Sequence, residues 1–236
     1  MFVRTEDFRT FLRLYPVVSI IVAVNFLIAI LAWFFPDLAA KGIGVNILIA
    51  QGEYWRLVTP IFLHGGLGHV LFNSFSLVLF GPYLERLLGK GKFLLVYLLT
   101  GIAADIATYM LESPYYSHVG SSGAIFGLFG IYLYMVLFRK DLIDQANSQI
   151  VITILVIGLL MTFTRANINI LAHLFGLISG AAIAPLFLGS PPRSPYGYNP
   201  YPARRRRNWT LPAGTLPKIM WGVLAVLILI GLLARF

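Results

Sequence analysis

Residues 17–35 read VVSIIVAVNFLIAILAWFF, a run without a charged side chain that ends at Pro36. An apolar stretch of about 20 residues is long enough to cross the hydrocarbon core of a bilayer as a helix. The whole chain has the same character, because 58% of its 236 residues are hydrophobic and only 11% are charged. Soluble domains carry about 25% charged residues, and strands of outer-membrane barrels alternate in polarity. The sequence therefore predicts an all-α polytopic membrane protein and excludes a soluble enzyme.

Six further apolar runs follow the first and give seven candidate spans. They lie at 67–80, 93–110, 120–138, 150–163, 168–188 and 219–234. Residues 190–217 are rich in Pro, Tyr and Arg, and their prolines exclude a packed helix. We therefore divide the chain into an N-terminal segment (1–16), a six-helix core (17–189), a linker (190–217) and a seventh helix (218–236).

The basic residues predict the orientation. With the N-terminus in the cytoplasm, most of the 18 Lys and Arg residues fall on the cytoplasmic side, including the run Arg204–Arg207. Such a bias is typical of the positive-inside rule. The net charge of +9 therefore indicates contact with anionic lipid headgroups, and no nucleic-acid partner is expected. We expect the plasma membrane of a prokaryote.

Polar side chains gather at one depth of the predicted spans. At about 1.5 Å per residue, His69, Ser122 and His173 lie about 20 to 26 Å from the cytoplasmic ends of their spans. That level is about 10 Å or less below the outer face. Asn73 shares a helix face with His69, four residues away. A nucleophile and a base in one layer are what acyl transfer requires.

Glycines accompany both candidate catalytic residues. Gly176 and Gly180 share a helix face with His173 and let another helix approach closely. Gly120 and Gly123 flank the serine and permit a bend that exposes it.

Other chemistries lack the residues that they need. Three histidines can bind zinc, but there is no His-Glu-x-x-His and no acidic neighbour in sequence. The chain has no cysteine, and Asp105 has no intramembrane partner for a carboxylate dyad. A transporter is expected to distribute ionisable residues along a path. No metal or cofactor is predicted.

These strings together resemble the rhomboid family of intramembrane serine proteases, bacterial type, over about 17–188. Three strings are similar to its main motifs: His64-Gly-Gly-Leu-Gly-His69-Val-Leu-Phe-Asn73, Gly120-Ser-Ser122-Gly123-Ala-Ile-Phe126-Gly127 and Ala172-His173-Leu-Phe-Gly176-Leu-Ile-Ser-Gly180. Two further strings resemble its flanking signatures: Trp55-Arg56 and Tyr83-Leu-Glu85-Arg86-Leu-Leu-Gly89. A seventh helix is a known variation of the family.

The resemblance implies a Ser122–His173 dyad without a third carboxylate. It implies an oxyanion hole made of the backbone N–H groups of Ser122 and Ser121 and the side chains of His69 and Asn73. Its implied supporting residues are His64 at the cavity, Phe126 stacked on the base where relatives carry Tyr, and Trp55, Arg56 and Glu85 as loop braces.

The implied substrates are single-pass transmembrane proteins, cut in or next to their membrane segments. The alternative is a catalytically silent relative that binds membrane helices. Asp105 lies outside the family pattern, and two interpretations stay open. It is either a hydrogen-bonded carboxyl braced by a loop or by backbone N–H groups, or it faces a water cavity and tunes the pH of cleavage.

Overall fold

The computed structural model describes residues 2, 5–164 and 168–189. In chain order the elements are α1 (Phe8–Leu14), α2 (Pro16–Phe34), α3 (Pro36–Gly42), β1 (Gly44–Val45), α4 (Asn46–Ala50), the 3-10 helices η1 (Tyr54–Leu57) and η2 (Thr59–Phe62), α5 (Leu67–Leu88), α6 (Lys90–Leu111), β2 (Ser117–His118), α7 (Ser122–Phe138), α8 (Gln145–Thr164) and α9 (Ile170–Leu188). Within these residues, α2, α5, α6, α8 and α9 are long and apolar enough to span a membrane, and α7 is a shorter apolar helix. The all-α polytopic class is confirmed. The predicted linker and seventh helix lie outside the described residues.

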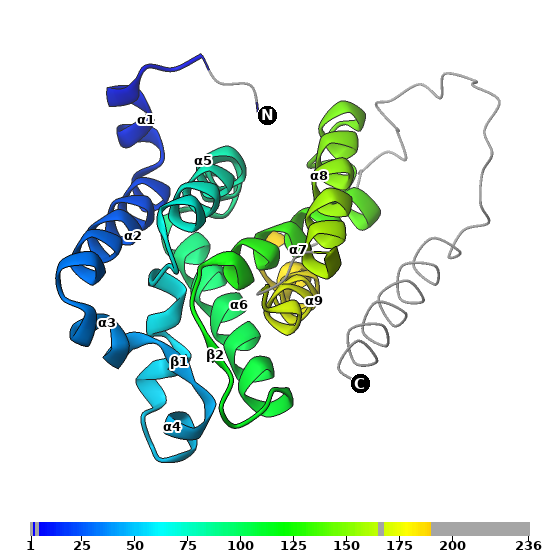
Figure 1. Ribbon diagram of the computed structural model, residues 1–236. Coiled ribbons are helices and arrows are strands. Elements are labelled where there is room, and N and C mark those ends of the chain that lie inside the picture. The colour runs from blue at the N-terminus through cyan, green and yellow to red at the C-terminus, as the bar shows by residue number, and fades with distance from the viewer. Residues whose placement is uncertain (1, 3–4, 165–167, 190–236) are drawn as a thin grey trace, which may run out of the picture.

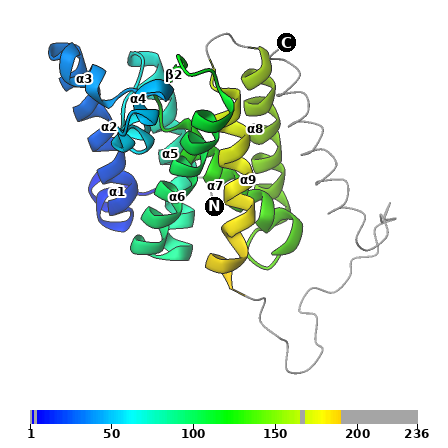
Figure 2. The same ribbon diagram turned by 90° about the horizontal axis from the view of Figure 1, so that it is seen from below.

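The helices are arranged with α2 and α8 at opposite edges of the bundle. Both views show α1 to α3 on one side and α8 on the other, with α5, α6, α7 and α9 between them (Figures 1 and 2). Burial agrees, because only 17% of the most apolar stretch of α2 and of α8 is buried, against 44% in α5, α6 and α9. Both edge helices therefore turn most of their apolar surface outward.

Three spans are longer than the sequence predicted. The third was expected at 93–110, whereas α6 covers Lys90–Leu111. The second was expected to end near Phe80, but α5 continues past Pro82 and ends at Leu88, just before Gly89, which has a φ of +80°. A proline in a helix removes only its own N–H donor and can be accommodated as a kink. The fifth span was expected from residue 150, but α8 begins at Gln145. With α5 extended to Leu88, His69 lies about 28 Å from the inner helix end, closer to the level of Ser122.

Glu85 joins the C-terminal part of α5 to the start of α2. Its carboxylate accepts hydrogen bonds from the backbone N–H groups of Val17 and Val18, at 2.9 Å each. These donors belong to the first turn of α2, where N–H groups have no partner inside the helix. Pro16 occupies the first helical position, where its missing N–H costs nothing. Glu85 is thus a buried cap, consistent with the bracing role that we predicted.

The α7–α9 contact is made by glycines. A Cβ on Gly176 would overlap the carbonyl oxygen of Gly123, and a Cβ on Gly180 would overlap that of Gly127. The two backbones are therefore in direct contact, which only glycine permits at these positions. This contact sets the height of α9 against α7.

Candidate active site

Ser122 is the first residue of α7 and follows a sharp turn. Gly120 has a φ of +128°, a conformation that L side chains rarely adopt. Its N–H donates to the Pro60 carbonyl oxygen of η2, at 2.8 Å. Ser121 is completely buried, whereas Ser122 is half-buried. The turn thus places the second serine of the pair at the more accessible position, at the positive end of the helix dipole.

The side chains of His69 and Asn73 lie against this turn. A Cβ on Gly120 would stand 2.7 Å from His69 Nε2 and 3.6 Å from Asn73 Nδ2. The Gly65 N–H donates to His69 Nδ1 over a long 3.4 Å, so the ring proton is assigned to Nε2, which faces the turn. Asn73 Nδ2 is buried and has no hydrogen-bond partner among the described residues. Two side-chain donors therefore converge beside the start of α7.

His64 contacts the other serine. Its Nε2 lies 3.3 Å from the Ser121 hydroxyl, and its ring meets that of His69 edge to face at 5.1 Å. The Ser121 side chain is thus occupied by His64, and only its backbone N–H remains for the predicted oxyanion hole. The structure brings His64, Ser121 and His69 into one polar cluster.

His173 reaches the same cluster from α9. Its ring stacks on Phe126 with centroids 4.2 Å apart and planes 17° from parallel. Phe126 lies one turn after Ser122 on the same face of α7. A Cβ on Gly123 would stand 3.5 Å from the Ala172 carbonyl oxygen. The residue after Ser122 therefore lies close to the residue before His173. The imidazole therefore lies beside the turn of α7 that begins with the serine.

The start of α9 is fixed by its cap. The Asn169 side chain accepts from the Ala172 N–H at 2.9 Å, and its amide donates to the Thr108 hydroxyl of α6 at 3.0 Å. An Asn cap satisfies one of the free donors of the first helical turn. Because the cap is bonded to a second helix, it also sets where His173, four residues later, stands in the bundle.

Sequence reasoning missed Thr162. This residue of α8 is 1% exposed, and its hydroxyl oxygen lies 2.7 Å from His173 Nδ1. It also donates to the Gly158 carbonyl oxygen at 2.7 Å. A threonine in an apolar span can bond to its own helix, so its spacing in the sequence gave no signal. Only its position at the C-terminal end of the fifth span, level with the histidine, could have suggested it.

Arg56 and Trp55 lie in the loop that follows the first span. The Arg56 guanidinium is buried and donates to the carbonyl oxygens of Ala40 at 2.9 Å and Ile43 at 2.5 Å. The Trp55 indole donates to the Lys41 carbonyl at 3.1 Å. Both side chains bind backbone carbonyls of this loop, in keeping with the predicted bracing roles.

Asp105 is buried and paired with a residue that we did not predict. Its carboxylate Oδ1 lies 3.2 Å from His118 Nε2, and it is 4% exposed. His118 belongs to β2, which pairs with β1 through Gly44. A Cβ on Gly44 would stand 2.5 Å from the His118 ring. The contact favours the brace over the water-cavity interpretation, and it ties the segment before Ser122 to α6.

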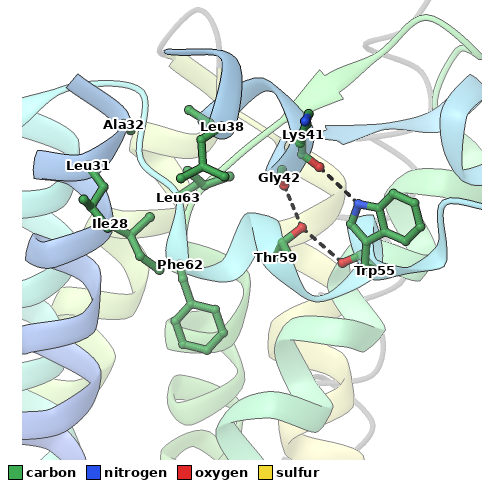
Figure 3. A pocket seen from close by; sticks show the side chains of 11 residues that line it. Ile28, Leu31, Ala32, Leu38, Lys41, Gly42, Trp55, Thr59, Phe62 and Leu63 are labelled. Carbon is green, nitrogen blue, oxygen red and sulfur yellow. Dashed lines mark hydrogen bonds between the residues drawn. The ribbon is translucent and has the colours of Figure 1, made fainter. Parts of the chain in front are cut away.

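An apolar pocket lies elsewhere, at the C-terminal end of α2 (Figure 3). It is bounded by α2, α3, η1 and η2, and among the described residues Lys41 is its one charged lining residue. Hydrogen bonds from Thr59 to the Gly42 carbonyl at 2.7 Å and to the Trp55 carbonyl at 3.1 Å support its wall. Neither Ser122 nor His173 lines it, so the pocket is separate from the polar cluster.

Fold and site together define a polytopic α-helical membrane protein with a serine and a histidine on facing helices. Residues 51–190 match the family described as Rhomboid domain. YdcA of Bacillus subtilis (strain 168), named as a putative rhomboid protease, is 54% identical over 188 residues, which are 76% of this chain and 92% of YdcA. Rhomboid protease GluP of the same bacterium is 43% identical over 160 residues, 68% of this chain and 31% of GluP. RHOMBOID-like protein 1 of Arabidopsis thaliana is 32% identical over 155 residues, 65% of this chain and 39% of that protein. The chain therefore belongs to the rhomboid family of serine proteases.

Proposed function

We propose that this chain hydrolyses peptide bonds in or next to transmembrane segments, with Ser122 as nucleophile and His173 as general base. One observation carries the proposal: the imidazole stacks on Phe126, one turn along α7 from the serine. A base that is held beside a half-buried hydroxyl at a helix start has the arrangement that nucleophilic catalysis needs.

The proposed reaction proceeds in two steps. Ser122 Oγ attacks the scissile carbonyl carbon while His173 Nε2 takes the hydroxyl proton. The imidazolium then gives this proton to the leaving amine, and an acyl-enzyme remains. Water, deprotonated by His173, attacks the acyl carbon, and the serine leaves with the proton returned to it. No cofactor enters the scheme.

The oxyanion is proposed to form beside Gly120. The donors are the side chains of His69 and Asn73 and the backbone N–H groups of Ser121 and Ser122. The unpartnered Nδ2 of Asn73 supports this role, because a buried amide donor is costly to leave without an acceptor. A preorganised donor of this kind lowers the barrier by about 2.7–4 kcal/mol.

The setting of the reaction is also part of the proposal. The N-terminus is cytoplasmic, the polar cluster opens toward the outer face, and the membrane is the plasma membrane of a prokaryote. The catalytic core covers 17–189, followed by a linker and a seventh helix. The bias of basic residues supports a cytoplasmic N-terminus. The proposed substrates are single-pass membrane proteins.

The experiment is cleavage of a single-pass reporter by purified protein in liposomes. Wild type, Ser122→Ala and the control Ser76→Ala are compared, because Ser76 is a serine of α5 that bonds only its own helix, at the Phe72 carbonyl. We expect cleavage by wild type and the control and none by Ser122→Ala. Cleavage by all three would contradict the assignment of the nucleophile. Cleavage by none, with folded protein, would favour a silent helix-binding relative.

A further inference from the structure

Thr162 is the only residue of α8 with a polar contact to His173 among the described residues. Its hydroxyl oxygen stands 2.7 Å from the imidazole Nδ1 and 2.7 Å from the Gly158 carbonyl oxygen. A hydroxyl has one proton to donate and two lone pairs with which to accept. Where that proton goes therefore decides which nitrogen of His173 carries hydrogen.

The Gly158 carbonyl decides the direction. A carbonyl oxygen can only accept, so the bond from Thr162 to Gly158 uses the single hydroxyl proton. Thr162 then accepts from His173, which places the ring hydrogen on Nδ1 and leaves the Nε2 lone pair free. That is the tautomer in which Nε2 can take a proton from Ser122.

The same bond serves the charged state of the ring. When Nε2 gains a proton, both ring nitrogens carry hydrogen and Nδ1–H still needs an acceptor. Thr162 is already oriented to accept, so no group has to turn during the reaction. In a Ser-His-Asp triad, a buried aspartate accepts the hydrogen bond from Nδ1–H of the histidine. The carboxylate of Asp105 is instead engaged by His118.

Packing holds the ring between two helices. Phe126 of α7 covers one face of the imidazole, and a Cβ on Gly158 would stand 3.2 Å from the Phe126 ring. Gly158 thus makes room for the aromatic ring, and Thr162, one turn later on the same face of α8, meets the histidine. Both residues of α8 shape the place in which His173 sits.

We propose that Thr162 is the positioning residue of the catalytic base, a neutral third member that fixes the tautomer and direction of the His173 ring. The inference rests on the proposed function, since it assigns His173 the role of base. It extends that function by making one residue of the edge helix α8 part of the serine protease machinery.

The test compares Thr162→Val, Thr162→Ser and Thr164→Val. Valine keeps the branched shape and removes the hydroxyl, while serine keeps the hydroxyl. Thr164 is the matched control, because it is exposed and donates only to the Leu160 carbonyl of the same helix, at 2.8 Å. For each variant, kcat and KM on the single-pass reporter and the thermal unfolding midpoint are measured.

We expect Thr162→Val to lower kcat about 10- to 100-fold with KM within about twofold, at the lower end of general-base effects. Thr162→Ser and Thr164→Val should stay within about threefold of wild type, with similar unfolding midpoints. Thr162→Val should unfold at a somewhat lower midpoint, because the buried Nδ1–H of His173 loses its acceptor. A kcat of Thr162→Val within about twofold of wild type, or an equal loss in Thr164→Val, would overturn the proposal. Equal losses in the Ser and Val variants would also overturn it, because the variant that keeps the hydroxyl should keep the activity.

A second measurement needs neither turnover nor a variant of Thr162. Protein with ¹⁵N-labelled histidine shows which ring nitrogen is protonated, and the signal of His173 is the one that His173→Asn removes. We expect hydrogen on Nδ1, and hydrogen on Nε2 would refute the inference. If the wild type cleaves no reporter, the proposed function fails, while this measurement still decides the role of Thr162.

Discussion

His173 is placed by two contacts of different kinds, one between α7 and α9 and one between α8 and α9. The first is backbone against backbone, with Gly176 and Gly180 leaving no space for a side chain. The second is a single hydrogen bond between the Thr162 hydroxyl of α8 and the imidazole. Only 17% of the apolar stretch of α8 is buried. The α7–α9 contact fixes where His173 stands, and the Thr162 hydrogen bond fixes how its ring is turned. Distance and direction are thus set by separate parts of the fold.

The largest expected effect comes from breaking the α7–α9 contact. Gly180→Val adds a branched side chain where a single Cβ already overlaps the Gly127 carbonyl oxygen. We expect a loss of stability of about 3 kcal/mol or more and no cleavage, because two packed backbones cannot yield as a side chain can. Thermal unfolding and reporter cleavage measure it. Gly91→Ala is the control, since a Cβ there meets nothing within 4 Å, and a stable, active Gly180→Val would contradict the account.

An intermediate effect is expected at the ring that covers the imidazole. Phe126→Leu removes the stack on His173 and keeps an apolar side chain. Aromatic pairs contribute about 0.5–1.5 kcal/mol beyond burial, so kcat should fall about two- to tenfold. Phe126→Tyr should retain the stack and most of the activity. Phe138→Leu, at the partly exposed C-terminal end of α7, is the control. A Phe126→Leu enzyme as active as wild type would show that the stack does not hold the base.

The smallest effect concerns the C-terminal ends of α7 and α9. Arg139 Nη1 donates to the Leu188 carbonyl at 2.8 Å and the Gly189 carbonyl at 2.7 Å, and Asp141 binds the same guanidinium. The hydrogen bond from the Arg139 side chain lowers the pKa of Asp141 below its ordinary value. Asp141→Asn should cost about 0.5 kcal/mol or less at pH 7, since the Asp141 side chain is 36% exposed although Arg139 is buried, and solvent weakens such an ion pair.

The pH dependence of that difference has a definite sign. A carboxyl whose folded pKa is lowered adds stability above its unfolded pKa, and the contribution is lost as pH falls through the folded pKa. The unfolding midpoints of wild type and Asp141→Asn should therefore converge as the pH is lowered below 3.8, the ordinary value. A gap that stays constant with pH would mean that the charge of Asp141 is not what stabilises Arg139.

Much of the architecture can be predicted from local pattern. Apolar runs located the five helices that are long enough to span a membrane and the shorter apolar helix α7, because a bilayer demands such runs, whatever the tertiary fold. The predicted end of the second span was wrong, because a proline such as Pro82 favours the end of a helix by local sequence alone. In the structure α5 packs against α2 and continues to Leu88. The polar residues Ser122 and His173 were predicted as candidates because polar side chains are costly inside a membrane.

The remaining site residues depend on which helices become neighbours. Nothing in the spacing of Thr162 separates it from a threonine that bonds to its own helix, and it does both. His118 reads as a loop residue until β1 and β2 pair and turn it toward Asp105. Such contacts join residues 11 and 13 positions apart on separate elements, so periodicity within one element cannot reveal them.

The most direct test of the dyad asks which serine is nucleophilic. The wild-type protein is treated with a fluorophosphonate, and the labelled peptide is sequenced by mass spectrometry. The account predicts one adduct, on Ser122, that disappears in His173→Asn because the serine then lacks its base. An adduct on Ser121, or labelling of Ser122 that survives without His173, would contradict the account.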